Sequence, residues 1–186
     1  MAQGNHETEI KLAVSDAREA RKRVLAAGFE VSRERVLERN IVFDTPDLAL
    51  RKSSRLLRLR QAARDITLTY KGVPTTAKHK SREELEVQVA DFDGMCGIIC
   101  RLGFQVTFRY EKYRTEFRQP RRAGVAMLDE TPLGVCLELE GTPHWIDRIA
   151  RKLGFDEDAY ITASYGRLFQ EWRTAHQSKS TDMTFS

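Results

Sequence analysis

Charged side chains recur at every second position in several short stretches of the chain. The first stretch, H-E-T-E-I-K, places Glu7, Glu9 and Lys11 at alternate positions. Alternate residues of a β-strand point to the same face, so two carboxylates and one ammonium would share one side of this strand. Later stretches repeat the spacing, and their alternating charged residues are Arg58 and Arg60, Arg82, Glu84 and Glu86, Lys112 and Arg114, and Glu138 and Glu140. Two further charged residues, Lys71 and Asp129, end neighbouring predicted strands.

These residue types suit one chemistry if they face a common space. An antiparallel sheet with one solvated face gives the same alternation, and its charges would then be ordinary surface residues. Burial of so many charges would instead require a ligand that neutralises them. Carboxylates supply the oxygen ligands that Mg²⁺ or Mn²⁺ prefers, whereas Arg and Lys bind phosphate oxygens. Acids and bases that alternate in this way therefore favour a metal-bound polyphosphate and phosphoryl transfer.

The elements that must position these side chains are mostly short strands. Period-two patterns and turn signals predict strands over residues 6–14, 30–44, 56–61, 65–72, 82–90, 104–118, 123–130 and 134–140. Amphipathic patterns predict helices over residues 15–28, 91–103, 142–153 and 164–174. Short connections favour antiparallel pairing, so the expected fold is α+β with about eight antiparallel strands in a closed or strongly curved sheet. Residues 1–174 are expected to form one domain, and 175–186 a polar, frayed C-terminal tail.

The composition is that of a globular chain with a mild excess of basic residues. Of its 186 residues, 41% are hydrophobic and 31% are charged, and the formal net charge is +4. No apolar run approaches membrane-spanning length and no secretory signal is visible, so we expect a cytoplasmic protein without a membrane partner. The three cysteines form no C-x-x-C pair, which fits reduced thiols. Acidic residues are interleaved with the basic ones, which argues against a nucleic-acid partner.

The ordered set of motifs resembles the CYTH superfamily, whose members are also called triphosphate tunnel metalloenzymes. The resemblance covers about residues 6–170, and the motifs that carry it are E-T-E-I-K, N-I-V-F-D-T-P-D-L-A-L, L-L-R-L-R, I-T-L-T-Y-K-G, R-E-E-L-E, E-K-Y-R, M-L-D-E-T-P-L-G, L-E-L-E-G and A-S-Y-G-R-L-F. It implies an eight-stranded antiparallel β-tunnel, a closed barrel with flanking helices, that binds a triphosphate-containing small molecule together with Mg²⁺ or Mn²⁺. Class IV adenylate cyclases, thiamine triphosphatases and inorganic triphosphatases belong to this superfamily.

The resemblance implies a role for each of the alternating charges. Residues expected to bind substrate phosphates are Lys11, Arg58, Arg60, Lys71, Lys112 and Arg114. Residues expected to hold the metal are Glu7, Glu9, Asp129, Glu138 and Glu140. Residues expected to be catalytic are Lys11, Glu9 and Glu140. Residues expected to support the metal ligands or the basic side chains are Arg82, Glu84 and Glu86.

Two positions depart from the family pattern. Animal-type thiamine triphosphatases place a Tyr two residues before the Asp of the D-T-P motif, where it partners the first-strand Lys, but this chain has Val42 there. The departure weakens the expectation of thiamine triphosphatase activity. Many members also carry a Lys before Ser-Tyr, where this chain has Ala163. A phosphate contact is therefore either missing or replaced by Lys78 or Lys80, from a polar, mobile loop predicted over residues 73–81.

Several functions stay open at this point. We favour a metal-dependent triphosphatase that hydrolyses inorganic triphosphate or a nucleoside triphosphate, because this activity needs only the tunnel residues. A class IV adenylate cyclase would use the same charges to convert ATP into cyclic AMP and pyrophosphate. Thiamine triphosphatase and a non-catalytic polyanion-binding module are the remaining alternatives. We expect a monomer or a homodimer.

Two other features have structural interpretations. Asp44 and Asp47 are expected to cap the turn of the D-T-P-D motif. The stripe of Trp145, Ile146 and Ile149 on a predicted helix indicates either core or a dimer face.

Overall fold

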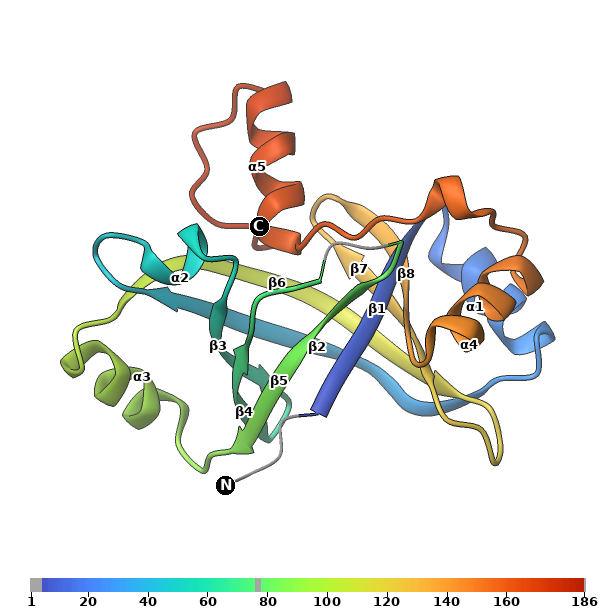
Figure 1. Cartoon of the computed structure of the whole chain (residues 1–186), viewed down its shortest axis with the longest axis horizontal. Helices are drawn as coiled ribbons and strands as arrows, with labels where there is room; N and C mark the ends of the chain where they lie inside the picture. Colours follow the sequence, from blue (N-terminus) through green and yellow to red (C-terminus); the bar gives the residue numbers. More distant parts are fainter. Residues whose placement is uncertain (1–4, 76–77, 186) are drawn as a thin grey trace.

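The architecture is that of a computed structural model, which describes residues 5–75 and 78–185. Residues 76 and 77 of the predicted loop over 73–81 lie outside the described residues. Figure 1 shows a strongly twisted sheet with helices at its two sides and a further helix above one end. The fold is therefore α+β, as the sequence predicted.

Eight antiparallel strands make up the sheet in the described part of the chain. They are β1 (Asn5–Val14), β2 (Glu30–Asp44), β3 (Leu56–Ala62), β4 (Asp65–Lys71), β5 (Lys80–Gln88), β6 (Gln105–Arg118), β7 (Val125–Thr131) and β8 (Gly134–Glu140). They close into a barrel in the order β1-β5-β4-β3-β2-β6-β7-β8. The prediction of an eight-stranded closed antiparallel barrel with flanking helices is confirmed.

The period-two pattern of the strands assigns each residue to the inside or the outside of the barrel. In β1, Ile10 and Leu12 are fully buried and belong to the apolar cluster formed with the outer helices. Glu9 and Lys11 alternate with them and therefore point to the opposite face, the interior. A slip of one residue in the pairing would exchange the two sets, so the buried apolar face fixes the register that places the charges inside.

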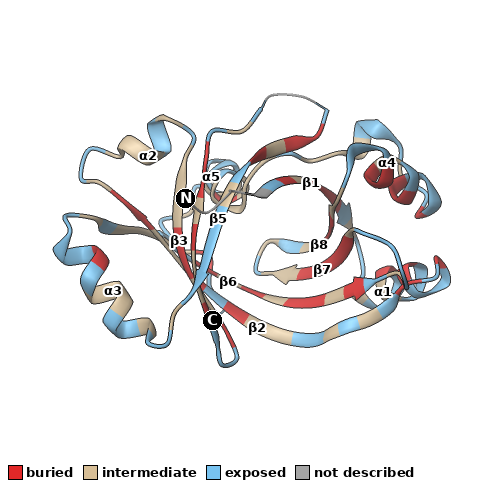
Figure 2. Ribbon diagram, turned by 60° about the horizontal axis from the view of Figure 1, so that its bottom comes forward, coloured by how far each residue is buried: buried red, intermediate tan, exposed pale blue. Residues whose placement is uncertain are grey.

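Helices α1 (Ala17–Ala26) and α4 (Pro143–Lys152) cover the outside of β1, β7 and β8. Asp16 caps the start of α1, and its carboxylate accepts the N–H of Glu19 at 2.8 Å. Trp145, Ile146 and Ile149 are buried, so the apolar stripe of α4 belongs to the core. In Figure 2 the buried residues of α4 and β7 mark this packed side of the barrel.

Helices α2 (Ala49–Lys52) and α3 (Phe92–Arg101) lie on the other side. Ile99 of α3 packs with residues of β2 and β3 in a second apolar cluster. The short helix α2 was not predicted. Asp44, which was predicted to cap the preceding turn, accepts the N–H groups of Leu50 and Arg51 in this helix, each at 2.9 Å. The capping prediction is confirmed for Asp44, whereas Asp47 accepts a hydrogen bond from the Thr45 hydroxyl, a side-chain contact within the same turn.

Helix α5 (Tyr165–Ala175), preceded by a 3₁₀ turn, η1 (Glu157–Ala159), and the last residues cover one end of the barrel. The tail was expected to be frayed, and that expectation was wrong. The backbone of Met183 bonds with Arg109 and Glu111 of β6, and the Met183 side chain is 1% exposed. Because β7 pairs with β6 only from Tyr113 onward, this earlier part of β6 has backbone groups that the tail satisfies.

Strand β5 begins at Lys80, so the predicted C-terminal boundary of the loop over 73–81 was wrong. Pairing of Lys80 with Glu9 on β1 extends the strand. Of the described helices, none combines the length and the apolar character needed to cross a membrane.

Candidate active site

Charged side chains from every strand of the barrel meet in its interior. The basic ones are Lys11, Arg58, Arg60, Lys71, Lys80, Arg82, Lys112 and Arg114. The acidic ones are Glu7, Glu9, Glu38, Glu84, Glu86, Asp129, Glu138 and Glu140. The structure thus brings together all the residues that the sequence singled out as a site, and it adds Glu38 and Lys80.

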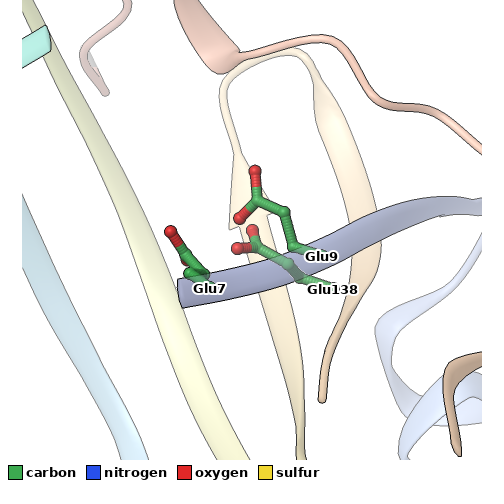
Figure 3. Close-up of side chains that lie close together, drawn as sticks. All are labelled: Glu7, Glu9 and Glu138. Carbon is green, nitrogen blue, oxygen red and sulfur yellow. The ribbon is translucent and has the colours of Figure 1, made fainter. Parts of the chain in front are cut away.

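The acid cluster consists of Glu7, Glu9, Glu84, Glu138 and Glu140, where β1 lies between β5 and β8. Glu9 stands opposite Glu140 in the register of β1 with β8. One carboxylate oxygen from each of Glu7, Glu9 and Glu138 lies within 4.8 Å of the other two. Figure 3 shows these three carboxylates directed to the same side of β1. Three carboxylates from two strands therefore converge on one point.

The cations of this cluster are Lys11, Lys71, Lys80 and also Arg114, whose Nη2 lies 3.1 Å from Glu138 Oε2. Lys80 Nζ lies 2.6 Å from Glu9 Oε1, and Lys11 Nζ lies 3.3 Å from the same oxygen. Lys71 Nζ bonds Glu7 and lies 3.1 Å from Glu84 Oε1. The five carboxyl groups outnumber the four cations that contact them, so the cluster has an excess of acidic groups.

The pKa values in the acid cluster reflect that excess. Burial, together with the carboxylates of Glu7 and Glu138, raises the pKa of Glu140 to about 7. Burial and a hydrogen bond with Glu7 raise the pKa of Glu84 to about 8. Burial opposes ionisation of Glu9 too, but the ammonium groups of Lys11 and Lys80 outweigh it and hold its pKa well below the usual value. The cluster thus contains carboxyls that hold protons near neutral pH.

The Asp129 cluster, formed by Glu38, Lys112, Arg114 and Asp129, lies across the interior on β2, β6 and β7. Arg114 donates to Asp129 through Nε at 2.7 Å and Nη2 at 2.6 Å, and Lys112 Nζ donates to Asp129 Oδ2 at 2.8 Å. The Tyr165 hydroxyl donates to the same Oδ2 at 2.6 Å. Asp129 is fully buried, and these cations overcome the cost of its burial and hold its pKa below the usual value.

Glu38 joins this cluster from β2. Its carboxylate lies 3.5 Å from Lys112 and 3.8 Å from Arg60. Although burial disfavours its charge, Lys112, Arg114 and Arg60 lower its pKa to about 2. Both carboxylates of the Asp129 cluster therefore stay ionised, Asp129 by hydrogen bonds from its cations and Glu38 by ion pairs with Lys112 and Arg60.

Arg58 and Arg60 extend the basic surface along β3. Arg58 donates to the Thr69 hydroxyl at 3.2 Å and to the Tyr110 hydroxyl at 3.4 Å. Each of the two arginines lies 3.6 Å from Glu86, whose side chain is 40% exposed. This exposure marks the more open part of the charged interior.

The acid cluster fits a hard divalent cation. Three close carboxylate oxygens from Glu7, Glu9 and Glu138 are the ligand type that Mg²⁺ and Mn²⁺ prefer, and the excess of acidic groups favours a cation. Glu140 stands beside this group in the strand register. Asp129, also predicted as a metal ligand, lies outside the group, and both its oxygens accept bonds from Lys112, Arg114 and Tyr165.

Sequence reasoning missed three residues of the interior. Glu38 lies on β2, where charged residues occur at both odd and even positions, so the sequence showed no clean alternation there. Lys80 was considered only as a replacement contact from a loop. Tyr165 was noted only within the A-S-Y-G-R-L-F motif, and only the folded chain shows that its hydroxyl reaches Asp129.

Two surface hollows lie outside the barrel. One, of about 320 Å³, is lined by α1 and the end of α4, including Ala27, Lys152 and Gly154. The other, of about 450 Å³, lies along α5 at Gln170 and Arg173. Neither is lined by an interior charge, so the charged interior is the candidate site.

The comparisons with known proteins agree with this geometry. A family model described as the CYTH domain matches residues 5–165. A curated protein from Methanocaldococcus jannaschii, named "Putative adenylate cyclase", is 31% identical over 169 residues, which span 86% of this chain and 95% of that protein.

Solved structures share the barrel. The PH1819 protein from Pyrococcus horikoshii is 27% identical with a TM-score of 0.77, and the match covers 90% of this chain and 99% of that one. A protein from Hippeastrum, described as a "putative adenylyl cyclase" that "reveals a dominant" triphosphatase activity, is 18% identical with a TM-score of 0.66, and the match covers 90% of this chain and 95% of that one.

Proposed function

The chain belongs to the CYTH domain family, and from this membership and the charged interior we propose that it is a divalent-metal-dependent enzyme acting on a triphosphate-containing substrate. The favoured reaction is hydrolysis of inorganic triphosphate or a nucleoside triphosphate. The observation that carries the proposal is the placement of a carboxylate cluster with an excess of acidic groups beside a cluster of fixed cations in one closed interior. A metal-bound triphosphate has the charges that complement both.

The proposed metal ligands are Glu7, Glu9 and Glu138, with Glu140 beside them. Mg²⁺ or Mn²⁺ held there would neutralise substrate charge and polarise phosphoryl oxygens. The lysines that now bond these carboxylates would exchange partners. Once Glu7 and Glu9 face a cation, Lys71 and Lys80 are free to donate to phosphate oxygens.

The fixed cations of the interior are the proposed phosphate-binding groups. Arg114 and Lys112 are held in place by Asp129, so they can meet a phosphate with little loss of side-chain entropy. Arg58 and Arg60 continue the same surface toward the more open part of the interior. A linear polyanion could therefore contact basic side chains along its length.

Two catalytic roles follow from protonation states. Although burial disfavours its charge, Glu138 and Glu9 raise the pKa of Lys11, so Lys11 stays an ammonium and stabilises phosphoryl charge rather than accepting a proton. Glu140, with a pKa near 7, is the carboxyl best matched to accept a proton from an attacking water near neutral pH. Glu9 is proposed to act through the metal and through Lys11, which it contacts.

A class IV adenylate cyclase is the second candidate, and the name of the Methanocaldococcus jannaschii relative favours it. In that reaction the ribose 3′-hydroxyl of ATP would attack the α-phosphorus and displace pyrophosphate. The same charges would serve, because the choice depends on which phosphorus faces the nucleophile. The Hippeastrum neighbour is described with both a cyclase name and a triphosphatase activity, so shared architecture does not choose between them.

The two remaining alternatives have less support. Val42, at the position where thiamine triphosphatases of animal type carry a Tyr, packs in an apolar cluster with Phe108 and Phe169. It provides no hydroxyl for Lys11. A non-catalytic polyanion-binding module would have no use for a carboxylate cluster that attracts cations.

A substrate panel tests the proposal. Tripolyphosphate, ATP, GTP and thiamine triphosphate would each be incubated with Mg²⁺ or Mn²⁺, and phosphate, pyrophosphate and cyclic nucleotide would be measured. We expect phosphate release that EDTA abolishes. Glu9→Gln should lower turnover by at least the ~10–100-fold that loss of a metal ligand's partner costs, whereas the matched change Glu171→Gln, on the exposed face of α5, should not.

Other outcomes would replace the proposal. Cyclic AMP and pyrophosphate from ATP, without phosphate from tripolyphosphate, would establish the cyclase. No turnover of any substrate, with binding that EDTA leaves unchanged, would favour the polyanion-binding module.

A further inference from the structure

Tyr165, the first residue of α5, reaches the charged interior from outside the barrel strands. Its hydroxyl donates to Asp129 Oδ2 at 2.6 Å and lies 3.1 Å from the sulfur of Cys136. Asp129 is the carboxylate that both Arg114 and Lys112 contact. The phenol is therefore bonded to the hub of the Asp129 cluster.

The ring of Tyr165 makes a second set of contacts. The ammonium nitrogens of Lys11 and Lys112 lie 5.2 Å and 4.9 Å from its centroid, within the range of cation–π attraction. Its other neighbour is Tyr110, whose ring stacks at 5.8 Å between centroids. One side chain thus contacts two lysines from strands that are not neighbours in the barrel, one on β1 and one on β6.

We propose that Tyr165 is a positioning residue for the substrate's phosphates, whose hydroxyl orients Asp129 and whose ring holds the ammonium groups of Lys11 and Lys112. The proposal rests on the proposed function, because those cations are its phosphate-binding groups. The two halves of the side chain act on different cations. The hydroxyl acts on Arg114 and Lys112 through Asp129, and the ring acts on Lys11 and Lys112 directly.

Tyr165 does not restore the lysine–tyrosine pair that Val42 removes. Its hydroxyl is bonded to Asp129, and it is the ring that Lys11 meets. The residue therefore acts by fixing cations and takes no part in proton transfer. Its position at the start of α5, where Ser164 caps the helix by accepting the N–H of Arg167, fixes the angle at which the side chain enters.

Two substitutions separate the ring from the hydroxyl. Tyr165→Phe keeps the ring and removes the hydroxyl, and Tyr165→Leu removes both. The matched control is Tyr113→Phe on β6, whose ring stacks on the Arg35 guanidinium at 3.4 Å on the outer face. Circular dichroism and urea denaturation would show that each variant folds, and the conservative Phe variant keeps the test valid if the Leu variant does not.

The readouts are metal-free binding of tripolyphosphate by calorimetry, and kcat and KM with Mn²⁺. We expect Tyr165→Phe to weaken binding and to raise KM by about 5–10-fold, and Tyr165→Leu to do so by about 30–100-fold, with a smaller change in kcat. Tyr113→Phe should match the wild type.

The outcomes distinguish this inference from the proposed function. If the wild type binds and turns over tripolyphosphate and the folded Tyr165 variants match it, the positioning role is wrong and the proposed function stands. A loss of kcat in Tyr165→Phe without a change in KM or binding would also overturn it, because that pattern indicates a catalytic hydroxyl. If the wild type neither binds nor turns over tripolyphosphate, ATP or GTP with Mn²⁺, the proposed function and this inference fail together.

Discussion

The acid cluster and the Asp129 cluster lie in the same barrel, yet carboxyl groups of the two have pKa values shifted in opposite directions. In the acid cluster, crowding raises the pKa of Glu140 to about 7 and that of Glu84 to about 8. In the Asp129 cluster, cations lower the pKa of Glu38 to about 2 and bond both oxygens of Asp129. The ratio of carboxylates to cations around each group explains the difference, since all of these groups are largely removed from water.

This difference assigns the two clusters different tasks. A carboxylate cluster with an excess of acidic groups is poised to accept a cation, and it gains stability when one arrives. A cluster whose acids and bases already satisfy one another is rigid, and its cations are held for an incoming anion. Under the proposed function, metal would bind at the acid cluster and phosphate at the Asp129 cluster, with Arg114, which contacts both Asp129 and Glu138, at their junction.

The largest expected effect comes from breaking the Asp129 cluster. Asp129→Ala would leave Arg114 and Lys112 buried without their main partner, which costs about 3–5 kcal/mol of unfolding free energy. The matched change in the acid cluster, Glu140→Gln, removes like-charge repulsion and should change stability by no more than about 1 kcal/mol. Urea denaturation at pH 7.5 measures the unfolding free energy of both variants. Equal losses in the two would contradict the proposed electrostatic difference between the clusters.

The next effect is the response of stability to pH and metal. Native Glu140 and Glu84 hold protons that the unfolded chain releases near pH 4.5, so metal-free stability should fall as the pH rises from about 4.5 to about 8. Glu38 has a lowered pKa, so its contribution to stability has the opposite pH dependence. Below pH 4.5 the protein loses that contribution as Glu38 becomes protonated toward pH 2.

Metal should reverse the loss at high pH. Mn²⁺ at about one hundred times its dissociation constant at pH 8 would stabilise the folded protein by ~2.7 kcal/mol there. The same concentration should stabilise it less at pH 5, because protons compete for the carboxylates. Urea denaturation at both pH values, with and without Mn²⁺, tests this. Metal-free stability that increases steadily from pH 5 to pH 8 would count against the raised carboxyl pKa values.

The smallest expected effect on stability comes from an ion pair on the protein surface, which serves as a reference for the buried pairs. Arg167 and Glu171 form an ion pair on α5 with side chains 73% and 57% exposed. Glu171→Gln should change stability by only ~0.3–0.5 kcal/mol, and less at high salt, because water screens the pair. A loss as large as that of Asp129→Ala would show that burial is not what distinguishes the pairs.

Much of the fold followed from the sequence because the alternation is strict where one face of a strand is buried. The outward Ile10 and Leu12 and the inward Glu9 and Lys11 leave β1 one acceptable register. The turn around Asp44 was also readable, since its cap depends on neighbours in sequence.

The missing parts depend on contacts between distant segments. Glu38 was missed because charged residues of β2 fall on both faces, so only the folded barrel shows which of them point inward. Lys80 looked like a loop residue until its pairing with Glu9 extended β5. Tyr165 bonds Asp129 on β7, and Met183 bonds the backbone of β6. These contacts join segments far apart in the sequence, so local sequence patterns could not predict them.

The proposed separation of metal and phosphate binding can be tested most directly by calorimetry on two variants. Mn²⁺ and metal-free tripolyphosphate would be titrated separately into the wild type, Glu7→Gln and Lys112→Gln. The account predicts that Glu7→Gln weakens Mn²⁺ binding by at least about tenfold and leaves tripolyphosphate binding unchanged or stronger. Lys112→Gln should do the reverse. Equal weakening of both ligands by both variants would contradict the account.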